Sequence, residues 1–150
     1  MAGCKQQLMI SYNWDSQKDV LKLREALTGY GYNVWIDIER MHENIYERMA
    51  EAVKESSIIL LCMTKKYEKS KNCNREFQFA EQLRKRIIPI YFEKNYTADG
   101  PLALIISGKR YFDLRNKGNF DSEILKLKEE VDEQLEELGT DLIVFLQTFI

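Results

Sequence analysis

The stretch that decides the fold is Ser70-Lys-Asn-Cys73-Asn-Arg-Glu76, which joins a predicted strand to a predicted helix. The apolar run before it, 58–63, is typical of a strand buried on both faces. The segment after it repeats apolar residues at the spacing of one helix face: Phe77, Ala80 and Leu83. Ser70 and Asn72 are favoured helix caps. Glu76 is therefore expected near the start of the helix, beside the carboxyl edge of the sheet, where open α/β folds bind ligands. From the residues alone, the simpler interpretation of Glu76 is a solvated acid stabilised by the helix dipole.

Length and composition indicate one globular domain. The chain has 150 residues, 45% hydrophobic and 31% charged, and a net charge of −2, which does not favour general nucleic-acid binding. We see no secretory signal and no run of apolar residues long enough for a membrane span, so we expect no membrane contact. The three cysteines do not pair off evenly, which favours a reduced, cytoplasmic setting. With no CxxC motif and a single histidine, His42, we expect neither a zinc site nor a His-based triad.

Strand and helix patterns alternate five times along the chain. We predict strands at 8–12, 33–37, 58–63, 87–92 and 109–114. Helices are predicted between them and at 122–138, where Gly139 is expected to end the last one. Segments 38–44 and 64–71 are predicted loops. This alternation favours a parallel sheet with helices on both faces.

The apolar tail at 140–150 leaves two possibilities open. It packs back on the core, or it joins a neighbouring domain or a partner chain.

Four short stretches carry a resemblance to a known family. They occur in order as Met9-Ile-Ser-Tyr-Asn-Trp-Asp15, Gly31-Tyr-Asn-Val-Trp-Ile-Asp37, the stretch 70–76, and Ile88-Pro-Ile90. Over roughly residues 8 to 137 the chain resembles a TIR domain, the Toll/interleukin receptor homology family. The resemblance implies a single TIR domain over 1–150, with its core at about 8–138. It also implies a flavodoxin-like α/β fold: a five-stranded parallel sheet of order 2-1-3-4-5 with helices on both faces.

The resemblance also implies a site. A crevice is expected where strand one lies between strands two and three. Enzymatic TIR domains use a glutamate in an S-x-x-C-x-x-E pattern, which makes Glu76 the expected catalytic residue. The expected substrate-binding residues are Tyr12, Asn13, Trp14, Asp37, Tyr46, Ser70 and Cys73. For Trp14 and Tyr46, stacking on nicotinamide or adenine stands beside simple packing at the sheet rim, and Asp37 can simply end its strand. The segment corresponding to the family's BB loop is Ile38, Glu39, Arg40, Met41, His42, Glu43 and Asn44.

TIR domains of two functional kinds are known, and the resemblance allows both. One kind is an NAD+ glycohydrolase that cleaves the nicotinamide–ribose bond, giving nicotinamide and ADP-ribose or cyclic ADP-ribose in innate-immune or cell-death signalling. NAD+ is then the substrate and no further cofactor is expected. The other kind is a non-catalytic TIR–TIR interaction module that signals by oligomerisation. The expected partners are therefore NAD+ and other TIR domains, without nucleic acid. A receiver-like or flavin-binding domain is a third possibility, although Asp15 and Asp37 alone do not form a receiver's acidic cluster.

Two features depart from the family pattern. Asn13 and Trp14 stand where several catalytic TIR domains have basic residues, and 41–44 lacks the usual BB-loop glycine.

Overall fold

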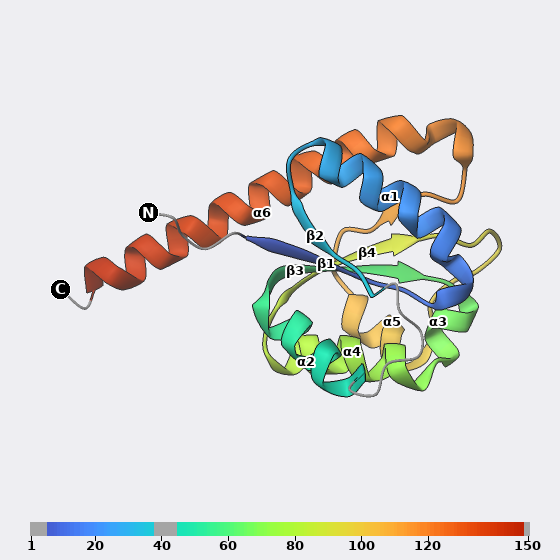
Figure 1. The fold of residues 1–150 in the computed structure, drawn as a ribbon, viewed down its shortest axis with the longest axis horizontal. Coiled ribbons are helices and arrows are strands. Elements are labelled where there is room, and N and C mark those ends of the chain that lie inside the picture. Colours follow the sequence, from blue (N-terminus) through green and yellow to red (C-terminus); the bar gives the residue numbers. More distant parts are fainter. Residues whose placement is uncertain (1–5, 38–44, 149–150) are drawn as a thin grey trace.

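A five-stranded parallel sheet in the order β2-β1-β3-β4-β5 forms the centre of the molecule (Figure 1). The computed structural model describes residues 6–37 and 45–148. Its strands are β1 (Gln7–Ser11), β2 (Asn33–Trp35), β3 (Ser56–Met63), β4 (Arg86–Tyr91) and β5 (Phe112–Asp113). Its α-helices are α1 (Gln17–Gly29), α2 (Ile45–Glu55), α3 (Lys65–Lys69), α4 (Lys71–Gln82), α5 (Gly100–Ile106) and α6 (Phe120–Thr148), and two 3₁₀ turns are η1 (Trp14–Ser16) and η2 (Lys117–Asn119). The predicted strand order and fold class are confirmed.

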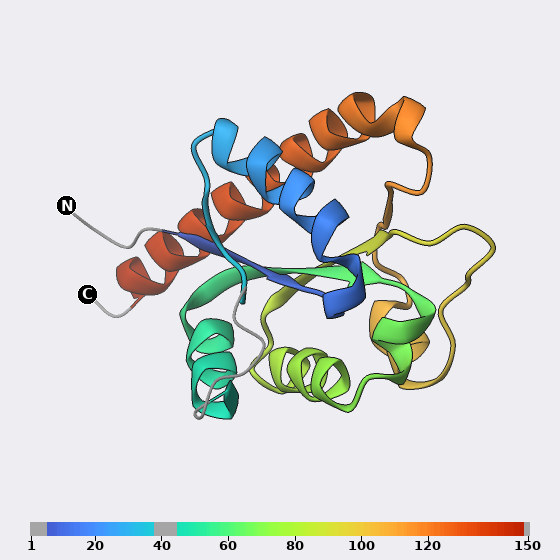
Figure 2. The same cartoon turned by 45° about the vertical axis from the view of Figure 1, so that its right-hand side comes forward.

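Helices cover both faces of the sheet. Because side chains alternate along a strand, β3 sends Ile58, Leu60 and Cys62 into one core and the residues between them into the other. The first core is closed by α1 and α6, and the second by α2, α3, α4 and α5 (Figures 1 and 2). The strand is therefore apolar throughout because both of its faces are covered.

The same alternation aims the end of β1. Leu8 and Ile10 enter the core under α1 and α6, whereas Met9 enters the core under α2 to α5. Ser11, two residues after Met9, shares that second face and is 1% exposed. The last residue of β1 thus presents a buried hydroxyl to the side of the sheet that carries α3 and α4.

Pro89 lies inside β4, and the sheet explains why it is accepted there. The Tyr91 carbonyl accepts a hydrogen bond from the Leu114 amide, so the backbone groups of Tyr91 face the β5 side of the strand. Residue 89, two positions earlier, faces the same side. Strand β5 pairs only with Ile90 and Tyr91, so no partner is lost by the missing proline N–H.

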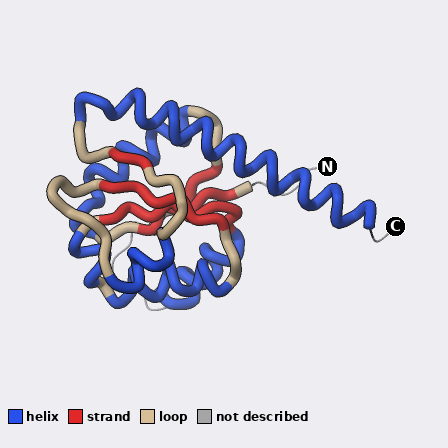
Figure 3. The backbone as a smooth tube through the Cα atoms, turned by 180° about the vertical axis from the view of Figure 1, so that it is seen from behind, coloured by secondary structure: helices blue, strands red, loops and turns tan. Residues whose placement is uncertain are grey.

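The last helix is longer than predicted. Gly139 does not end it: α6 continues to Thr148, and its final turns extend beyond the body of the domain (Figure 3). Gly139 keeps a negative φ, and Arg86 forms ion pairs with Glu137 and, at 3.7 Å, Asp141, on either side of it. A single glycine disfavours a helix interior by only about 1 kcal/mol, which these contacts and the helix-forming neighbours outweigh.

Two other predicted boundaries are wrong. The segment 64–71, predicted as a loop, contains α3, which begins where the Thr64 hydroxyl accepts from the Tyr67 amide. The fifth strand is only Phe112–Asp113 instead of 109–114. Both differences arise where a short element is held by its neighbours more than by its own pattern.

The end of α6 does not pack back on the core. Five consecutive apolar side chains there remain 51–57% exposed: Leu142, Ile143, Val144, Phe145 and Leu146. Within the described residues no helix is long and apolar enough to cross a membrane. The described part of the tail, residues 140–148, therefore does not take the first of the two possibilities, and the contact with a neighbouring domain or partner chain stays a prediction.

This exposure predicts a stability result. Replacing Leu142 and Leu146 together with Gln should leave the melting temperature within about 2–4 °C of wild type, because each surface change is usually within about 0.5 kcal/mol and about 1 kcal/mol shifts a domain of this size by that amount. Leu127→Ala, fully buried on the same helix, should lower stability by about 2–5 kcal/mol. Thermal unfolding followed by circular dichroism checks both. A melting temperature for the double variant as low as that of Leu127→Ala would mean that the tail is covered in solution.

Candidate functional site

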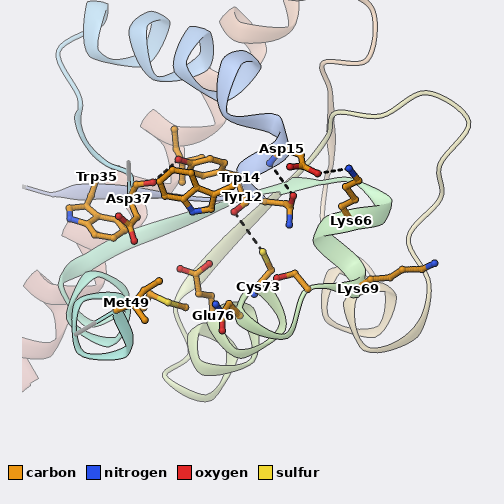
Figure 4. A pocket seen from close by; sticks show the side chains of 15 residues that line it. Tyr12, Trp14, Asp15, Trp35, Asp37, Met49, Lys66, Lys69, Cys73 and Glu76 are labelled. Atoms are coloured by element: carbon orange, nitrogen blue, oxygen red, sulfur yellow. Dashed lines mark hydrogen bonds and ion pairs between the residues drawn. The ribbon is translucent and has the colours of Figure 1, made fainter. Parts of the chain in front are cut away.

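A cavity of about 610 Å³ opens at the carboxyl edge of the sheet. It lies where β1 separates β2 from β3, the switch point at which open α/β sheets bind ligands. Its volume is in the range of small-molecule sites. It is lined from β1, the segment after it, the end of β2, and helices α2, α3 and α4: Ile10, Tyr12, Asn13, Trp14, Asp15, Trp35, Asp37, Ile45, Met49, Lys66, Lys69, Ser70, Asn72, Cys73 and Glu76 (Figure 4).

Each polar position of the Ser-x-x-Cys-x-x-Glu stretch has a distinct task. Ser70 is the N-cap of α4, where its Oγ accepts from the Cys73 amide at 3.2 Å. Cys73, one turn on, is buried and its Sγ donates to the Tyr12 carbonyl at 3.6 Å, tying α4 to the segment after β1. Glu76 follows after about 4.5 Å more of helix. The pattern therefore starts the helix, anchors it to the sheet, and delivers a carboxylate to the cavity.

The Glu76 carboxylate is directed into the cavity from α4 (Figure 4). Its Oε1 accepts a hydrogen bond from the Ser11 hydroxyl at 2.8 Å. Burial raises the pKa of this carboxyl from 4.5 to about 7; the Ser11 hydrogen bond lowers it, and the nearby Asp37 charge raises it. A group that titrates near neutral pH at the edge of a cavity can both stabilise positive charge and exchange a proton.

Tyr12 and Trp14 shape the wall opposite Glu76. The Tyr12 hydroxyl donates to the Asp37 carbonyl at 2.6 Å, which joins the ends of β1 and β2. The Tyr12 and Trp14 rings stack with centroids 6.3 Å apart, and Trp14 lies in η1, whose N-cap is Asn13. The Tyr12 hydroxyl is therefore committed to structure, while the Trp14 ring is an apolar surface toward the cavity.

Cys73 is not built as a nucleophile. Burial raises the pKa of its thiol to about 12, even though the Ser70 hydroxyl lowers it, and Glu76 raises it further. The thiol is protonated at neutral pH, and only a thiolate would attack a substrate. Its contribution to the site is the contact with Tyr12 and the shape of the cavity floor.

Lysines of α3 lie at the outer end of the cavity. Lys66 forms an ion pair with Asp15, and Lys69 extends outward, away from Glu76 (Figure 4). A second cavity of about 500 Å³ adjoins this end and shares Asp15, Lys66 and Lys69 with the first. A long ligand with one end at Glu76 would thus meet positive charge where it leaves the cavity.

The structure brings most of the predicted site residues together. The ones that line the cavity are Tyr12, Asn13, Trp14, Asp37, Ser70, Cys73 and Glu76. Tyr46 is 56% exposed and lies instead at a smaller cavity between α2 and α4, under the Arg75 guanidinium. The predicted BB loop, Ile38, Glu39, Arg40, Met41, His42, Glu43 and Asn44, lies outside the described residues.

Sequence reasoning missed several residues of the site: some line the cavity, and one, Ser11, lies behind the lining and donates to Glu76. The most informative is Ser11, a polar residue that ends an apolar strand, and this position at the carboxyl edge was the signal available. Lys66 and Lys69 were missed because α3 was predicted as a loop. Trp35 and Met49 followed the ordinary apolar pattern of a strand and a helix, so nothing in the sequence separated them from core residues.

The described part of the chain contains no cluster of His, Cys, Asp and Glu that could hold a metal ion.

Comparison with solved structures finds the same fold in proteins of low sequence identity. The TIR domain of the Toll-related receptor TRR-2 from Hydra magnipapillata has a TM-score of 0.67 at 19% identity, over 83% of this chain and 97% of that one. The TIR domains of the activated Roq1 resistosome, which directly recognises the pathogen effector XopQ, give 0.63 at 19% identity, over 84% and 99%. The Clostridium botulinum CMP N-glycosidase BcmB gives 0.60 at 18% identity, over 83% and 99%.

A comparison with curated proteins finds no sequence that matches this one. The model of the TIR domain family, in contrast, matches residues 8–128, which reach from the second residue of β1 through β5 into α6 and include the whole of the cavity lining. The chain therefore belongs to the TIR domain family.

Proposed function

We propose that this TIR domain is an NAD+ glycohydrolase, with Glu76 as its catalytic residue. The observation that carries the proposal is a half-buried carboxylate directed into a cavity of about 610 Å³ whose walls include aromatic rings. One further support is that BcmB, which shares the fold, is a CMP N-glycosidase and so acts on the N-glycosidic bond of a nucleotide. The products are nicotinamide and ADP-ribose, or cyclic ADP-ribose if the adenine replaces water as the nucleophile.

The reaction needs only one carboxylate. The bond between ribose C1′ and the pyridinium nitrogen breaks, and its electron pair neutralises nicotinamide, which leaves without a proton. The ribose carries oxocarbenium-like positive charge, which the ionised Glu76 stabilises at short range. A water oxygen then bonds to C1′, and Glu76, with its pKa near 7, accepts the proton that the water loses.

Aromatic side chains give the cavity affinity for flat rings. Trp14, from the turn η1 that follows β1, and Trp35, from β2, both line it. Stacking on nicotinamide or adenine would use these surfaces. We assign Tyr46 no stacking role in this proposal, because it lies outside the cavity lining.

The direct test is to incubate the purified chain with NAD+ and follow nicotinamide by chromatography. CMP, followed by cytosine release, is the second substrate. We expect release of nicotinamide and no release of cytosine. Release of cytosine alone would mean that the chain is a glycosidase with CMP, and not NAD+, as its substrate. No release of either base at high protein concentration would reject the enzymatic proposal.

A TIR–TIR interaction module is the second candidate, favoured by the exposed apolar end of α6. In that case Met41→Ala should abolish assembly, as measured by light scattering, and Glu76→Ala should leave assembly unchanged. A cytoplasmic setting suits both candidates, since Cys62 and Cys73 are free thiols. We propose that either activity serves signalling in innate immunity or cell death.

The α3 lysines give the substrate proposal a sharper prediction. The residues after β1 are the uncharged Asn13 and Trp14, so Lys66 and Lys69 are the cations placed to meet the phosphates of NAD+. Replacing both with Ala should raise KM for NAD+ by about tenfold and leave kcat unchanged, because charge-assisted contacts contribute about 1.5–3 kcal/mol at most and these lysines are exposed. Steady-state kinetics measures this.

Nicotinamide riboside, which has no phosphate, is the control substrate, and its KM should be the same in the double variant as in wild type. Lys22→Ala, exposed on α1 and outside the cavity lining, is the matched control protein. An equal rise in KM for both substrates would show that the lysines do not bind the phosphates.

A further inference from the structure

Behind Glu76 lies a buried chain of two hydroxyl groups. Ser11 Oγ is 2.8 Å from Glu76 Oε1 and 2.8 Å from the Tyr67 hydroxyl oxygen. Ser11 is 1% exposed and Tyr67 is fully buried. The three groups come from β1, α3 and α4, so the sheet and two helices must meet correctly for the chain to form.

The direction of the hydrogen bonds follows from the number of hydrogens. Ser11 has one hydroxyl hydrogen, and it is donated to the Glu76 carboxylate. The oxygen of Ser11 can then only accept from Tyr67. Burial raises the pKa of the Tyr67 hydroxyl well above its usual range, and Cys73 and Glu76 raise it further, so this hydroxyl keeps its proton and remains a donor.

We propose that Tyr67 and Ser11 are positioning residues that hold Glu76 Oε1 against the protein, leave Oε2 for the substrate, and favour the ionised carboxylate. Hydrogen bonds in such a chain polarise one another, so the Tyr67 hydroxyl acts on Glu76 through Ser11. The catalytic consequence rests on the proposed function; the effect on the carboxyl itself does not.

The other groups that face Glu76 do not replace this effect. Asp37, from the end of β2, disfavours the ionised form, as does burial. The Cys73 thiol on α4 is neutral, and Lys66 on α3 is paired with Asp15. The guanidinium of the neighbouring Arg75 lies over the Tyr46 ring, 5.2 Å from its centroid, on the α2 side. Among the described groups that shift the pKa of Glu76, only the Ser11 hydroxyl lowers it.

A purely structural interpretation is available, because a buried tyrosine hydroxyl needs a partner in any case. The two interpretations differ in what Tyr67→Phe does. This change removes one oxygen and keeps the ring that packs on Phe77 with centroids 6.1 Å apart. A structural role predicts a change in stability alone, whereas a positioning role predicts a change in the titration of Glu76.

The experiment is a titration of the Glu76 carboxyl by ¹³C NMR in the full chain, without substrate. In Tyr67→Phe we expect its pKa to rise by about one pH unit, a tenfold higher proton affinity. Ser11→Ala should raise it at least as much, and Ser11→Thr, which keeps the hydroxyl, should restore the wild-type value. In the enzyme assay Tyr67→Phe should lower kcat several-fold at pH 7 and leave KM unchanged. At pH 8.5 the kcat of this variant should return to near the wild-type value.

Tyr96→Phe is the matched control. Its hydroxyl also donates to a glutamate, Glu68 Oε1 at 2.8 Å, away from the cavity lining. The pKa of Glu76 should not change in this variant. An unchanged pKa in folded Tyr67→Phe would overturn the proposal; if that variant does not fold, Ser11→Ala decides in the same way. A shifted pKa in a chain that cleaves no NAD+ would reject the proposed function and keep the hydroxyl chain.

Discussion

Glu76→Gln is expected to lower kcat for nicotinamide release from NAD+ by about 10³-fold, because it removes the charge that faces the developing cation. The substitution is conservative in shape, and the Gln oxygen can still accept from Ser11 at the position of Oε1. KM should change little, since the cavity walls and the α3 lysines stay in place. Chromatographic measurement of nicotinamide over a range of NAD+ concentrations separates the two constants.

Glu81→Gln is the matched control, an exposed glutamate on the same helix that lies outside the cavity lining. It should retain wild-type activity. Persistence of full activity in Glu76→Gln would remove this carboxylate from the mechanism. Loss of activity in both Glu76→Gln and Glu81→Gln would indicate that the substitutions disrupt the structure of α4.

The pH dependence of the wild-type enzyme checks the same assignment. Because the ionised form is the active one and the pKa of Glu76 in the free protein is raised to about 7, kcat/KM should rise with pH and reach half of its plateau near neutral pH. Below about pH 6 it should fall about tenfold for each pH unit. A profile that is flat from pH 5 to 8 would contradict a role for a group that titrates near 7.

Glu76→Gln is also expected to stabilise the fold at pH 8, by up to about 3 kcal/mol. The pKa of Glu76 is raised from 4.5 to about 7 in the folded chain, chiefly by burial. The folded state therefore binds the proton more tightly than the unfolded state. Its stability is highest below pH 4.5 and falls as the pH rises toward 7. The neutral Gln side chain does not ionise, so the variant keeps this stability as the pH rises. Because Glu76 lines an open cavity, water stabilises its charged form in part, and the gain in stability is smaller than about 3 kcal/mol.

Thermal unfolding at pH 8 and at pH 4.5 tests this sign. We expect a melting temperature several degrees above wild type at pH 8, since about 1 kcal/mol shifts a domain of this size by 2–4 °C, and no difference at pH 4.5. Glu81→Gln should show no such pH dependence. A Gln variant less stable than wild type at pH 8 would mean that the folded protein favours the charged carboxylate. A gain in stability together with a loss of activity is the relation expected for a functional group held in an unfavourable place.

The sequence by itself determined the layers of the fold. Apolar runs of strand length, such as 58–63, alternated with helical patterns, and this alternation predicts a parallel sheet covered on both faces. Capping chemistry placed the start of α4 at Ser70 or Asn72, of which the structure uses Ser70, and it placed Glu76 near that start. These features are local: they depend on residues a few positions apart, whose backbone preferences and spacing are visible in the chain.

Only the tertiary structure decided the environment of the carboxylate and the ends of several elements. Ser11 contacts Glu76 across 65 positions of the chain and Tyr67 across 56, and no pattern of period 2 or 3.6 reports such contacts. Gly139 was expected to stop α6, but Arg86 of β4 pairs with acids on both sides of it. In each case the deciding contact joins residues from different elements, so its free energy exists only after the sheet has brought those elements together.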